Sequence, residues 1–596
     1  MDWDLDSYFP AFDGPEYRRF KDELGNALEA VEARIEAQDG FEPATFAGWE
    51  AIVLGYEDAV RRVGHINSYL ECLCAADAAR DDYRREYAAL ALQAAELKKL
   101  EVALVDVFGG ARHDQFEAFL KRDALVGAEF SVRRWREKAR KVMPPSEESL
   151  AADLEVDGIK AWSRLYDTIS GTLEFTLRHP DGHEERIPVA RRRALMASSD
   201  RAVRAAAFHG GNAAWASVEA TCAAALNAMA GSRLTLGGRR GERHFLEPAL
   251  FEHRIGLASL DALQQALVDR AEVARAMVRL KARRLGVDAV AWYDLEAPTP
   301  GVADTDAERL SWDAGVARVD AAFSRAYPAL GEYFRAAVSR RWFDHAARRG
   351  KRPGAFCTSS EITHESRVFM TWEGAMNDVV TLAHEVGHAW HAHVLRAARP
   401  LACGYPMTLA ESASTFGEML LIDGLLEDAA VPAAVKLALL DSQARQAMGF
   451  LLDVPARFEF ERSFYEERAH GEVSVARLKE LMSAAQRKLF GDALAVGEED
   501  PLFWASKLHF YIAEVPFYNF PYTVGFLLSR ALFARFKLEG SAFLPVYEAF
   551  LAKSGGATCE SLAKEVLGAD LESPAFWAGA IDSMIPAGER LAALLK

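Results

Sequence analysis

Hydrophobic residues recur every three or four positions through most of this chain, with charged residues between them. That spacing is typical of amphipathic helices and predicts a mostly α-helical protein. The first part reads as three long helices over Tyr17–Ala37, Phe46–Ala75 and Asp81–Val107, with glycines at 40 and at 109–110 between them. We therefore expect a large helical body.

Two segments alternate instead and predict short strands. Residues 173–178 and 186–189 flank the turn residues Asp181 and Gly182, which predicts a β-hairpin. A domain boundary is expected near this hairpin, with an N-terminal helical domain over 1–190 and a second domain over 191–596. Glu365–Trp372 is β-branched and aromatic and predicts one more strand. Such a strand either forms a small structural hairpin or holds an extended peptide by main-chain hydrogen bonds.

Composition and charge exclude several classes of protein. Half of the residues are hydrophobic, enough for a sizeable core, and the 70 basic residues are outnumbered by 87 acidic ones. A net charge of −17 argues against nucleic acid as a partner, since phosphate binding requires a basic field. The basic cluster over 133–141 is interpreted as a solvated helix face.

The chain is expected to be cytoplasmic, with no membrane partner. Its acidic N-terminus lacks the basic start and apolar run of a secretory signal, and no apolar stretch approaches the ~20 residues that cross a bilayer. Six scattered cysteines do not form a disulfide framework. The sequence makes no prediction of oligomeric state.

The strongest chemical signal is His384-Glu385-x-x-His388. The surrounding segment, 376–394, lacks proline and carries apolar residues at helical spacing, so the two histidines lie one turn apart on one face and can meet one metal ion. Glu385 can reach a water on that metal and take its proton. Because so short a motif also arises by chance, its weight depends on the rest of the chain.

A catalytic zinc site needs a third protein ligand. The helix continues with His391, Val394 and Ala397 and so lacks the third histidine of the longer zinc motif. We therefore expect a carboxylate on a second helix. Glu411 follows His388 by 23 positions, with the helix breakers of 404–406 between them.

Small residues surround Glu411 over 410–415, which favours close helix packing and a buried carboxylate rather than a solvated one. Glu418 lies seven positions further, on the same face of that helix. We expect Glu411 to be the third ligand and Glu418 to accept a hydrogen bond from a ligand histidine.

A third group of polar and aromatic residues lies near the end of the chain. His509, Tyr518 and Tyr522 could stabilise the oxyanion of peptide hydrolysis by hydrogen bonds, and the two tyrosines have the spacing to converge on a helix. Aromatic density of this kind also occurs in protein cores, so this function requires the segment to face the metal.

Together, these motifs resemble the oligoendopeptidase F branch of the thimet oligopeptidase family of zinc peptidases. The resemblance rests on three segments: 370–388, 410–418, and 509–525 from His-Phe-Tyr to Tyr-x-x-Gly. It covers about 355–425 and 505–530 specifically, and the N-terminal half fits the family plan more weakly. Three ordered motifs are far more specific than one.

The resemblance implies a helical body with a deep substrate channel, one zinc ion at its floor and a small antiparallel β element beside the zinc helix. It makes 191–596 the catalytic domain of a zinc metallopeptidase and implies endopeptidase action on short, unfolded oligopeptides.

By position, the resemblance assigns zinc binding to His384, His388 and Glu411, and general-base catalysis to Glu385. It assigns transition-state hydrogen bonding to His509 and Tyr522, with Tyr518 beside them. One departure is Phe520, which stands where the branch often has a tyrosine, so the aromatic that does the polar work stays open.

The expected activity is thus that of a zinc metalloendopeptidase. Two alternatives remain: a zinc carboxypeptidase or dipeptidase on a related helical scaffold, and a catalytically silent peptide-binding protein. Glu385 argues against the silent binder, because a protein that only binds peptides has no need of that base.

Overall fold

The computed structural model describes residues 2–179, 181–302 and 309–596 and is largely helical, as the hydrophobic spacing predicts. The first three predicted helices are present as α1 (Pro15–Ala37), α2 (Phe46–Ala76) and α3 (Asp81–Gly110). Their bounds differ from the predicted ones by at most three residues. Helical periodicity thus located these elements accurately.

The chain folds into two compact units, each assembled from three separate segments. The first unit contains Met1–Lys141, Thr305–Val431 and Leu532–Ala569, and the second contains Val142–Asp304, Pro432–Ala531 and Asp570–Lys596. This division differs from the single boundary expected near residue 190. Each core is completed by helices that return from later in the sequence, which local pattern does not reveal.

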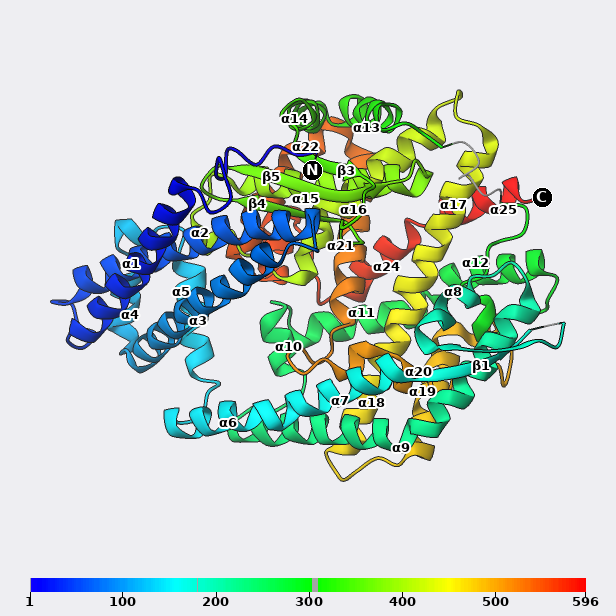
Figure 1. The fold of residues 1–596 in the computed structure, drawn as a ribbon, viewed down its shortest axis with the longest axis horizontal. Coiled ribbons are helices and arrows are strands. Elements are labelled where there is room, and N and C mark those ends of the chain that lie inside the picture. The colour runs from blue at the N-terminus through cyan, green and yellow to red at the C-terminus, as the bar shows by residue number, and fades with distance from the viewer. Residues whose placement is uncertain (1, 180, 303–308) are drawn as a thin grey trace. The chain divides into compact units, whose positions relative to one another are not determined.

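The first unit joins a set of N-terminal helices to a small sheet and the helices around it (Figure 1). Besides α1 to α3, its elements are α4 (His113–Leu120), α5 (Glu129–Ala139), α13 (Trp312–Ala326), α14 (Pro328–Ser339), β3 (Phe343–Ala346), β4 (Phe356–Ser360), β5 (Glu365–Trp372), α15 (Met376–Leu395), α16 (Met407–Glu427), α22 (Leu544–Lys553) and α23 (Cys559–Leu562).

The sheet of the first unit has the strand order β3-β5-β4. Strand β5 has the bounds predicted from sequence; it pairs with β4 in antiparallel and with β3 in parallel. Figure 1 shows β5 between its two neighbours, with α15 against the sheet. The main chain of β5 is paired with β4 over Glu365–Phe369 and with β3 over part of its length, which leaves little of it for a bound peptide and favours the structural alternative.

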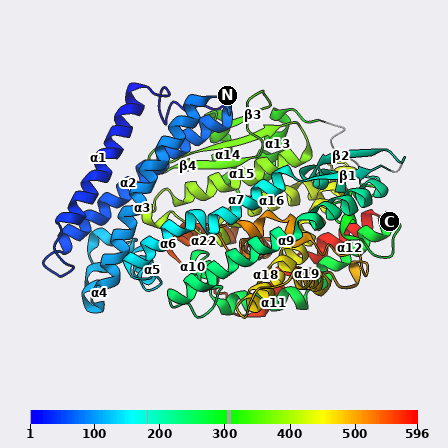
Figure 2. The same ribbon diagram turned by 60° about the horizontal axis from the view of Figure 1, so that its bottom comes forward.

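The second unit contains the predicted hairpin and a set of packed helices; in Figure 2, α7 lies alongside α9. Its elements are α6 (Pro145–Asp157), α7 (Ile159–Thr172), β1 (Glu174–Arg178), β2 (Glu184–Pro188), α8 (Arg192–Met196), α9 (Arg201–Arg239), α10 (Glu247–Glu252), α11 (Leu257–Asp269), α12 (Ala271–Leu285), α17 (Ala433–Met448), α18 (Val454–Arg468), α19 (Val475–Phe490), α20 (Phe503–Ser506), α24 (Pro574–Asp582) and α25 (Ile585–Leu594). Helix α21 (Phe520–Glu539) runs across the boundary between the second and first units.

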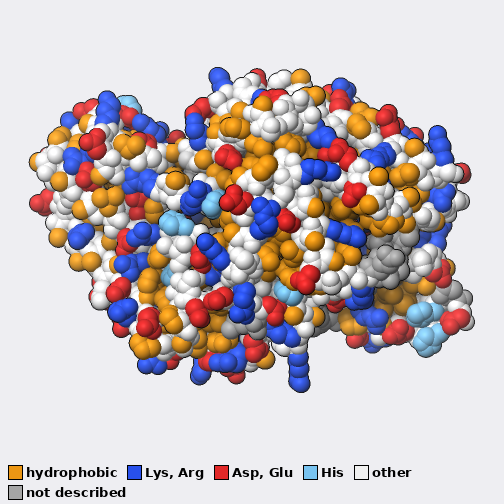
Figure 3. All heavy atoms as spheres, turned by 90° about the horizontal axis from the view of Figure 1, so that it is seen from above, with side chains coloured by type: hydrophobic (Ala, Val, Ile, Leu, Met, Phe, Trp, Pro, Cys, Tyr) orange, Lys and Arg blue, Asp and Glu red, His pale blue; other side chains and the backbone are white. Residues whose placement is uncertain are grey.

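The surface is mixed in charge: acidic and basic side chains are interspersed over the face drawn in Figure 3. All six cysteines carry free thiols, as their irregular spacing predicts. In the part of the chain that the structure describes, no helix combines the length and apolar character of a membrane-spanning segment.

Candidate metal centre

Helix α15 carries both histidines of the motif and is fixed at its start by Asp378. The Asp378 carboxylate accepts hydrogen bonds from the backbone N–H groups of Glu373 and of the N-cap residue Ala375, at 2.8 and 3.0 Å, which ties the preceding chain to the start of the helix. From this helix His384 and His388 converge, with their Nε2 atoms 3.2 Å apart. The one-turn spacing therefore produces the predicted pair.

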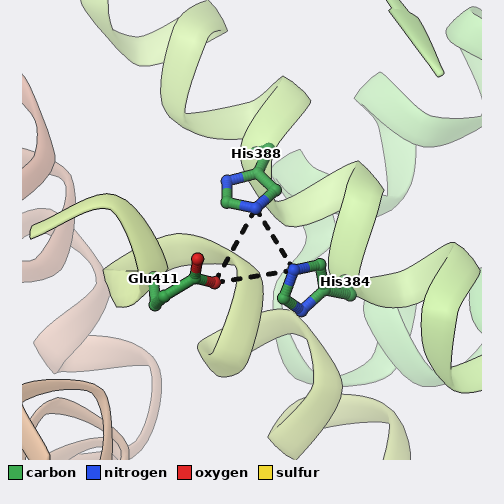
Figure 4. A group of neighbouring side chains, drawn as sticks. All are labelled: His384, His388 and Glu411. Atoms are coloured by element: carbon green, nitrogen blue, oxygen red, sulfur yellow. Dashed lines mark hydrogen bonds and ion pairs between the residues drawn. The ribbon is translucent and has the colours of Figure 1, made fainter. Parts of the chain in front are cut away.

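Glu411 on α16 completes a group of three side chains (Figure 4). Its Oε2 atom lies 3.5 Å from His384 Nε2 and 3.7 Å from His388 Nε2. The hydroxyl of Ser414, one turn further along α16, donates a hydrogen bond to the same oxygen at 2.5 Å. The carboxylate thus has a defined orientation toward the two imidazoles.

The separations within this cluster fit a tetrahedral metal ion. Ligand bonds of about 2.0–2.1 Å at tetrahedral angles place two donor atoms about 3.3 Å apart. The three observed separations, 3.2, 3.5 and 3.7 Å, lie close to that value. Two imidazole nitrogens and one carboxylate oxygen also leave one tetrahedral position for another ligand.

Glu418 orients the first imidazole from two helical turns beyond Glu411. Its Oε1 atom lies 2.5 Å from His384 Nδ1, the contact predicted from the seven-residue spacing. When Nδ1–H donates to this carboxylate, the Nε2 lone pair of the neutral ring is directed at the cluster.

Close packing of α15 on α16 brings these residues together. A Cβ atom on Gly417 would lie only 2.8 Å from the carbonyl oxygen of Ala383, so the helices touch through backbone at this point. Ser412, Ala413, Ser414 and Thr415 are buried, as this close approach requires. Ala410 and Glu411 are only partly buried, so the expectation of a buried Glu411 carboxylate is only partly met. The fold thus uses small side chains to bring the two halves of the cluster within bonding range of one ion.

Glu385 lies beside the cluster and is 6% exposed. Its Oε2 atom is buried and has no hydrogen-bond partner among the described residues. Glu385, His384 and His388 line a cavity of about 720 Å³ in the first unit, whose wall includes all of β4 and the segment 403–405. The Glu385 carboxyl therefore lies in the wall of a space that can hold water and a ligand.

The carboxylates around the cluster favour positive charge there. Burial alone would lower the pKa of His384, but the hydrogen bond and charge of Glu418, together with Glu411, raise it to about 9. Burial raises the pKa of the Glu385 carboxyl to about 7, against the opposing effect of His384. Burial lowers the pKa of His388. The site is therefore suited to hold a cation at the Nε2 atoms.

The three late residues lie together in the second unit. His509 belongs to a short 3-10 helix over Leu508–Tyr511 and stacks on Tyr518, with ring centroids 5.3 Å apart and planes 17° apart. Tyr522 meets Tyr518 edge-on at 5.5 Å. The expectation that both tyrosines share a helix is wrong, because α21 begins at Phe520 and Tyr518 precedes it. Burial, followed by the positive charges of Arg457 and Lys507, lowers the pKa of His509 to about 4.

Sequence reasoning missed some neighbours of the cluster. Ser414 was identified only as a small residue, although its spacing from Glu411 is the ordinary i, i+3 contact of a helix. His391, one turn beyond His388, points away from the cluster, and its Nε2 atom lies 2.8 Å from Ser554 Oγ. Ser554 lies more than 160 positions away in the sequence, so local pattern gives no signal for that contact.

Comparisons with curated proteins match most of the chain. An oligoendopeptidase F homolog of Lactococcus lactis subsp. lactis strain IL1403 is 27% identical over 385 residues, 64% of this chain. The match spans 62% of the length of that relative. Oligopeptidase PepF of Bacillus subtilis strain 168 is 23% identical over 589 residues, 96% of this chain and 84% of the relative.

Solved structures share the fold over nearly the whole chain. The crystal structure of a putative peptidase from Chlamydophila abortus superposes with a TM-score of 0.85 at 17% identity, covering 99% of this chain and 98% of the other. Oligoendopeptidase-F from Enterococcus faecium superposes with a TM-score of 0.69 at 20% identity, covering 97% and 99%. The helical architecture is thus an established fold.

Two family models match consecutive parts of the sequence. The model described as oligopeptidase F matches residues 111–175, and the model described as peptidase family M3 matches residues 194–582, well over half of the chain. The second match includes the motif on α15 and the carboxylates on α16. This chain belongs to peptidase family M3.

Proposed function

We propose that this protein is a zinc-dependent endopeptidase that hydrolyses internal peptide bonds of short, unfolded oligopeptides. The observation that carries the proposal is the cluster of His384, His388 and Glu411, with separations that fit one tetrahedral ion and with Glu385 beside it in a cavity. Membership of a peptidase family and the names of the relatives, oligoendopeptidase and oligopeptidase, support it.

Zinc is the proposed ion because of the donor set. Two imidazoles and one carboxylate with an open fourth position form the ligand set of many hydrolytic zinc sites. Bound zinc supplies Lewis acidity, which polarises a peptide carbonyl and lowers the pKa of water. Glu418 supports the site by holding His384 with Nε2 toward the ion.

Glu385 is the proposed general base. The Glu385 carboxylate lies in the wall of the cavity and can accept a proton from the attacking water while the water oxygen bonds to the peptide carbonyl carbon. The same carboxyl then returns the proton to the nitrogen of the leaving amine as the C–N bond breaks. One water is thereby consumed for each peptide bond.

His509 and Tyr522 are proposed as hydrogen-bond donors to the oxyanion, with Tyr518 beside them. Within the second unit, the stacking of His509 on Tyr518 and the contact of Tyr518 with Tyr522 support their action as one group. The lowered pKa of His509 keeps its imidazole neutral near pH 7, in a form that donates one N–H. Such donors stabilise an oxyanion by about 3–4 kcal/mol each in other hydrolases.

Oligopeptides are the proposed substrates and the cytoplasm the proposed compartment. A cavity of about 720 Å³ accommodates a short length of extended chain beside the cluster. Six free thiols suit a reducing compartment. The acidic net charge of −17 gives no general attraction for nucleic acid.

Digestion of a mixed peptide library, with and without a chelator, tests the proposal. Mass spectrometry of the products should show internal cuts that disappear with the chelator and return with zinc. Peptides blocked at both ends should still be cleaved, which separates an endopeptidase from a carboxypeptidase or dipeptidase. Cleavage only at free ends would contradict the endopeptidase assignment, and peptide binding without any cleavage would favour a silent binder.

A further inference from the structure

Tyr405 lies outside any helix or strand, but its ring is packed against the buried ring of His391. It lies between α15 and α16, and its ring stacks on His391 with centroids 4.1 Å apart and planes 6° apart. His391 is itself fully buried, and its Nε2 atom contacts Ser554 Oγ at 2.8 Å. Because the Ser554 hydroxyl donates its own proton to the carbonyl of Leu551, it accepts from His391 Nε2–H. The Tyr405 ring thus packs on His391, and His391 is in turn held by its hydrogen bond to Ser554.

The hydroxyl of Tyr405 is free although the ring is fixed. Tyr405 lines the cavity that also contains His384, Glu385 and His388. No described residue forms a hydrogen bond with this hydroxyl. The hydroxyl is also not one of the buried atoms, so it is accessible from the cavity. By contrast, Tyr333 in the same unit donates its hydroxyl to a backbone carbonyl at 3.0 Å. A hydroxyl on a rigid ring, open to a cavity, is available to a ligand.

The hydroxyl is also close to the metal cluster and remains protonated. Tyr405 precedes Glu411 by six positions, just before the start of α16. Burial, followed by the nearby Cys357 and the Glu411 carboxylate, raises the pKa of the phenol above its ordinary value. It therefore acts as a hydrogen-bond donor at neutral pH.

We propose that Tyr405 is a substrate-contacting residue whose hydroxyl donates a hydrogen bond to a main-chain carbonyl of the bound peptide. This proposal rests on the proposed function. His391 and Ser554 are positioning residues that keep its ring in place. A contact to the main chain does not depend on the substrate's side chains, so it contributes to binding of peptides of different sequence. The buried histidine that follows the zinc motif thereby acquires a role, although it does not bind the metal.

The test measures peptide binding without turnover. The probe is a fluorescently labelled, end-blocked nonapeptide that the wild-type enzyme cleaves, and binding is measured by anisotropy with the zinc-loaded Glu385→Gln variant. Adding Tyr405→Phe removes the hydroxyl but keeps the ring on His391. We expect the Kd to rise about five- to tenfold, the effect of one neutral hydrogen bond, with zinc content and thermal midpoint unchanged. Tyr17→Phe is the matched control, because the Tyr17 hydroxyl is occupied by Glu86 elsewhere in the unit, and it should leave the Kd unchanged.

A double-mutant cycle tests the positioning residues. Ser554→Ala removes the acceptor of His391 with little change in volume, so it should weaken peptide binding by itself but add little in the Tyr405→Phe background. Additive effects would overturn the positioning role. An unchanged Kd in Tyr405→Phe, with a wild-type enzyme that cleaves the peptide, would overturn the contact while leaving the proposed function intact. A wild-type protein that neither binds nor cleaves peptides would overturn both.

Discussion

Gly387 of α15 lies against the backbone of α16 at Ala413. A Cβ atom on Gly387 would be 2.4 Å from the Ala413 carbonyl oxygen and 2.5 Å from Ser414 Cα, distances that real side chains do not tolerate. Glycine at the centre of the zinc motif therefore allows the approach that brings the two histidines to the carboxylate of the next helix. A glycine within a helix normally lowers stability by about 0.5–1 kcal/mol relative to alanine. At position 387 this loss accompanies the close helix contact that the site requires.

Gly387→Ala should consequently push α15 and α16 apart. We expect a loss of about 1–3 kcal/mol in stability from overpacking and a fall of at least about tenfold in zinc affinity, as measured by thermal unfolding and competitive zinc titration. Gly64→Ala on α2 is the control, since a Cβ there would meet no atom within 4 Å apart from the adjacent residues and backbone of its own helix, and it should be neutral or stabilising. Unchanged zinc affinity in Gly387→Ala would show that helix spacing does not control the cluster.

Glu418 should control zinc affinity without touching the ion. Glu418→Ala removes the acceptor of His384 Nδ1–H, so the ring loses its fixed orientation and part of its basicity. We expect zinc affinity to fall about 10- to 100-fold, and less in Glu418→Gln, which keeps an acceptor oxygen. Asp423→Ala is the control on the same helix, because Asp423 pairs with Lys537 instead. Equal zinc affinities in wild type and Glu418→Ala would contradict this role.

Glu411 should be required for zinc occupancy. Glu411→Ala removes one of three donors, and we expect the purified protein to hold substoichiometric zinc by atomic emission analysis. Ser414→Ala deletes only the hydrogen bond to Glu411 Oε2 and should reduce affinity more modestly. Full zinc occupancy in Glu411→Ala would mean that the third ligand is another residue.

The protein should become less stable as the pH is lowered below 6.5, because of His65, a buried histidine in the first unit. Its Nδ1 atom lies 2.7 Å from Ser360 Oγ, and its ring stacks on Tyr8. Burial lowers its pKa to about 4, below the ordinary value of 6.5. Between these two values the unfolded chain binds the proton and the folded protein does not. The free energy of unfolding is therefore not reduced by His65 above pH 6.5. As the pH falls from 6.5 toward 4, protonation of His65 in the unfolded chain lowers this free energy by up to about 3 kcal/mol.

Urea denaturation between pH 4 and 7.5 measures this effect, in the presence of a chelator because zinc binding itself depends on pH. His65→Gln should lower the midpoint at pH 7.5 and reduce its pH dependence below 6.5. If wild type and variant lose stability in parallel as the pH falls, His65 does not account for the acid sensitivity.

Local helical geometry explains why much of the site could be predicted. The juxtaposition of His384 and His388 follows from a four-residue spacing, and that of Glu411 and Glu418 from a seven-residue spacing on one helix. The small residues around Glu411 indicated close packing, and the structure shows α16 in backbone contact with α15. These inferences needed only the periodicity of one element at a time.

Features that depend on distant segments could not be predicted in this way. The bounds of β5 were predicted from its residues, but its central position depends on pairing with β3 and β4. The His391 ring that stacks on Tyr405 also contacts Ser554, which lies 163 positions from His391 in the sequence. The same limitation applies to the two units, each of which combines early and late segments that no local pattern connects.

Glu385→Gln tests the central claim most directly, when its zinc content and its cleavage of an end-blocked peptide are measured on the same sample. The substitution keeps the size of the side chain and one acceptor oxygen but removes the basic carboxylate next to the metal ligands. The account predicts one zinc per chain, as in the wild type, and loss of internal cleavage by a factor of about 10² or more. Normal turnover by the zinc-loaded variant would contradict the account.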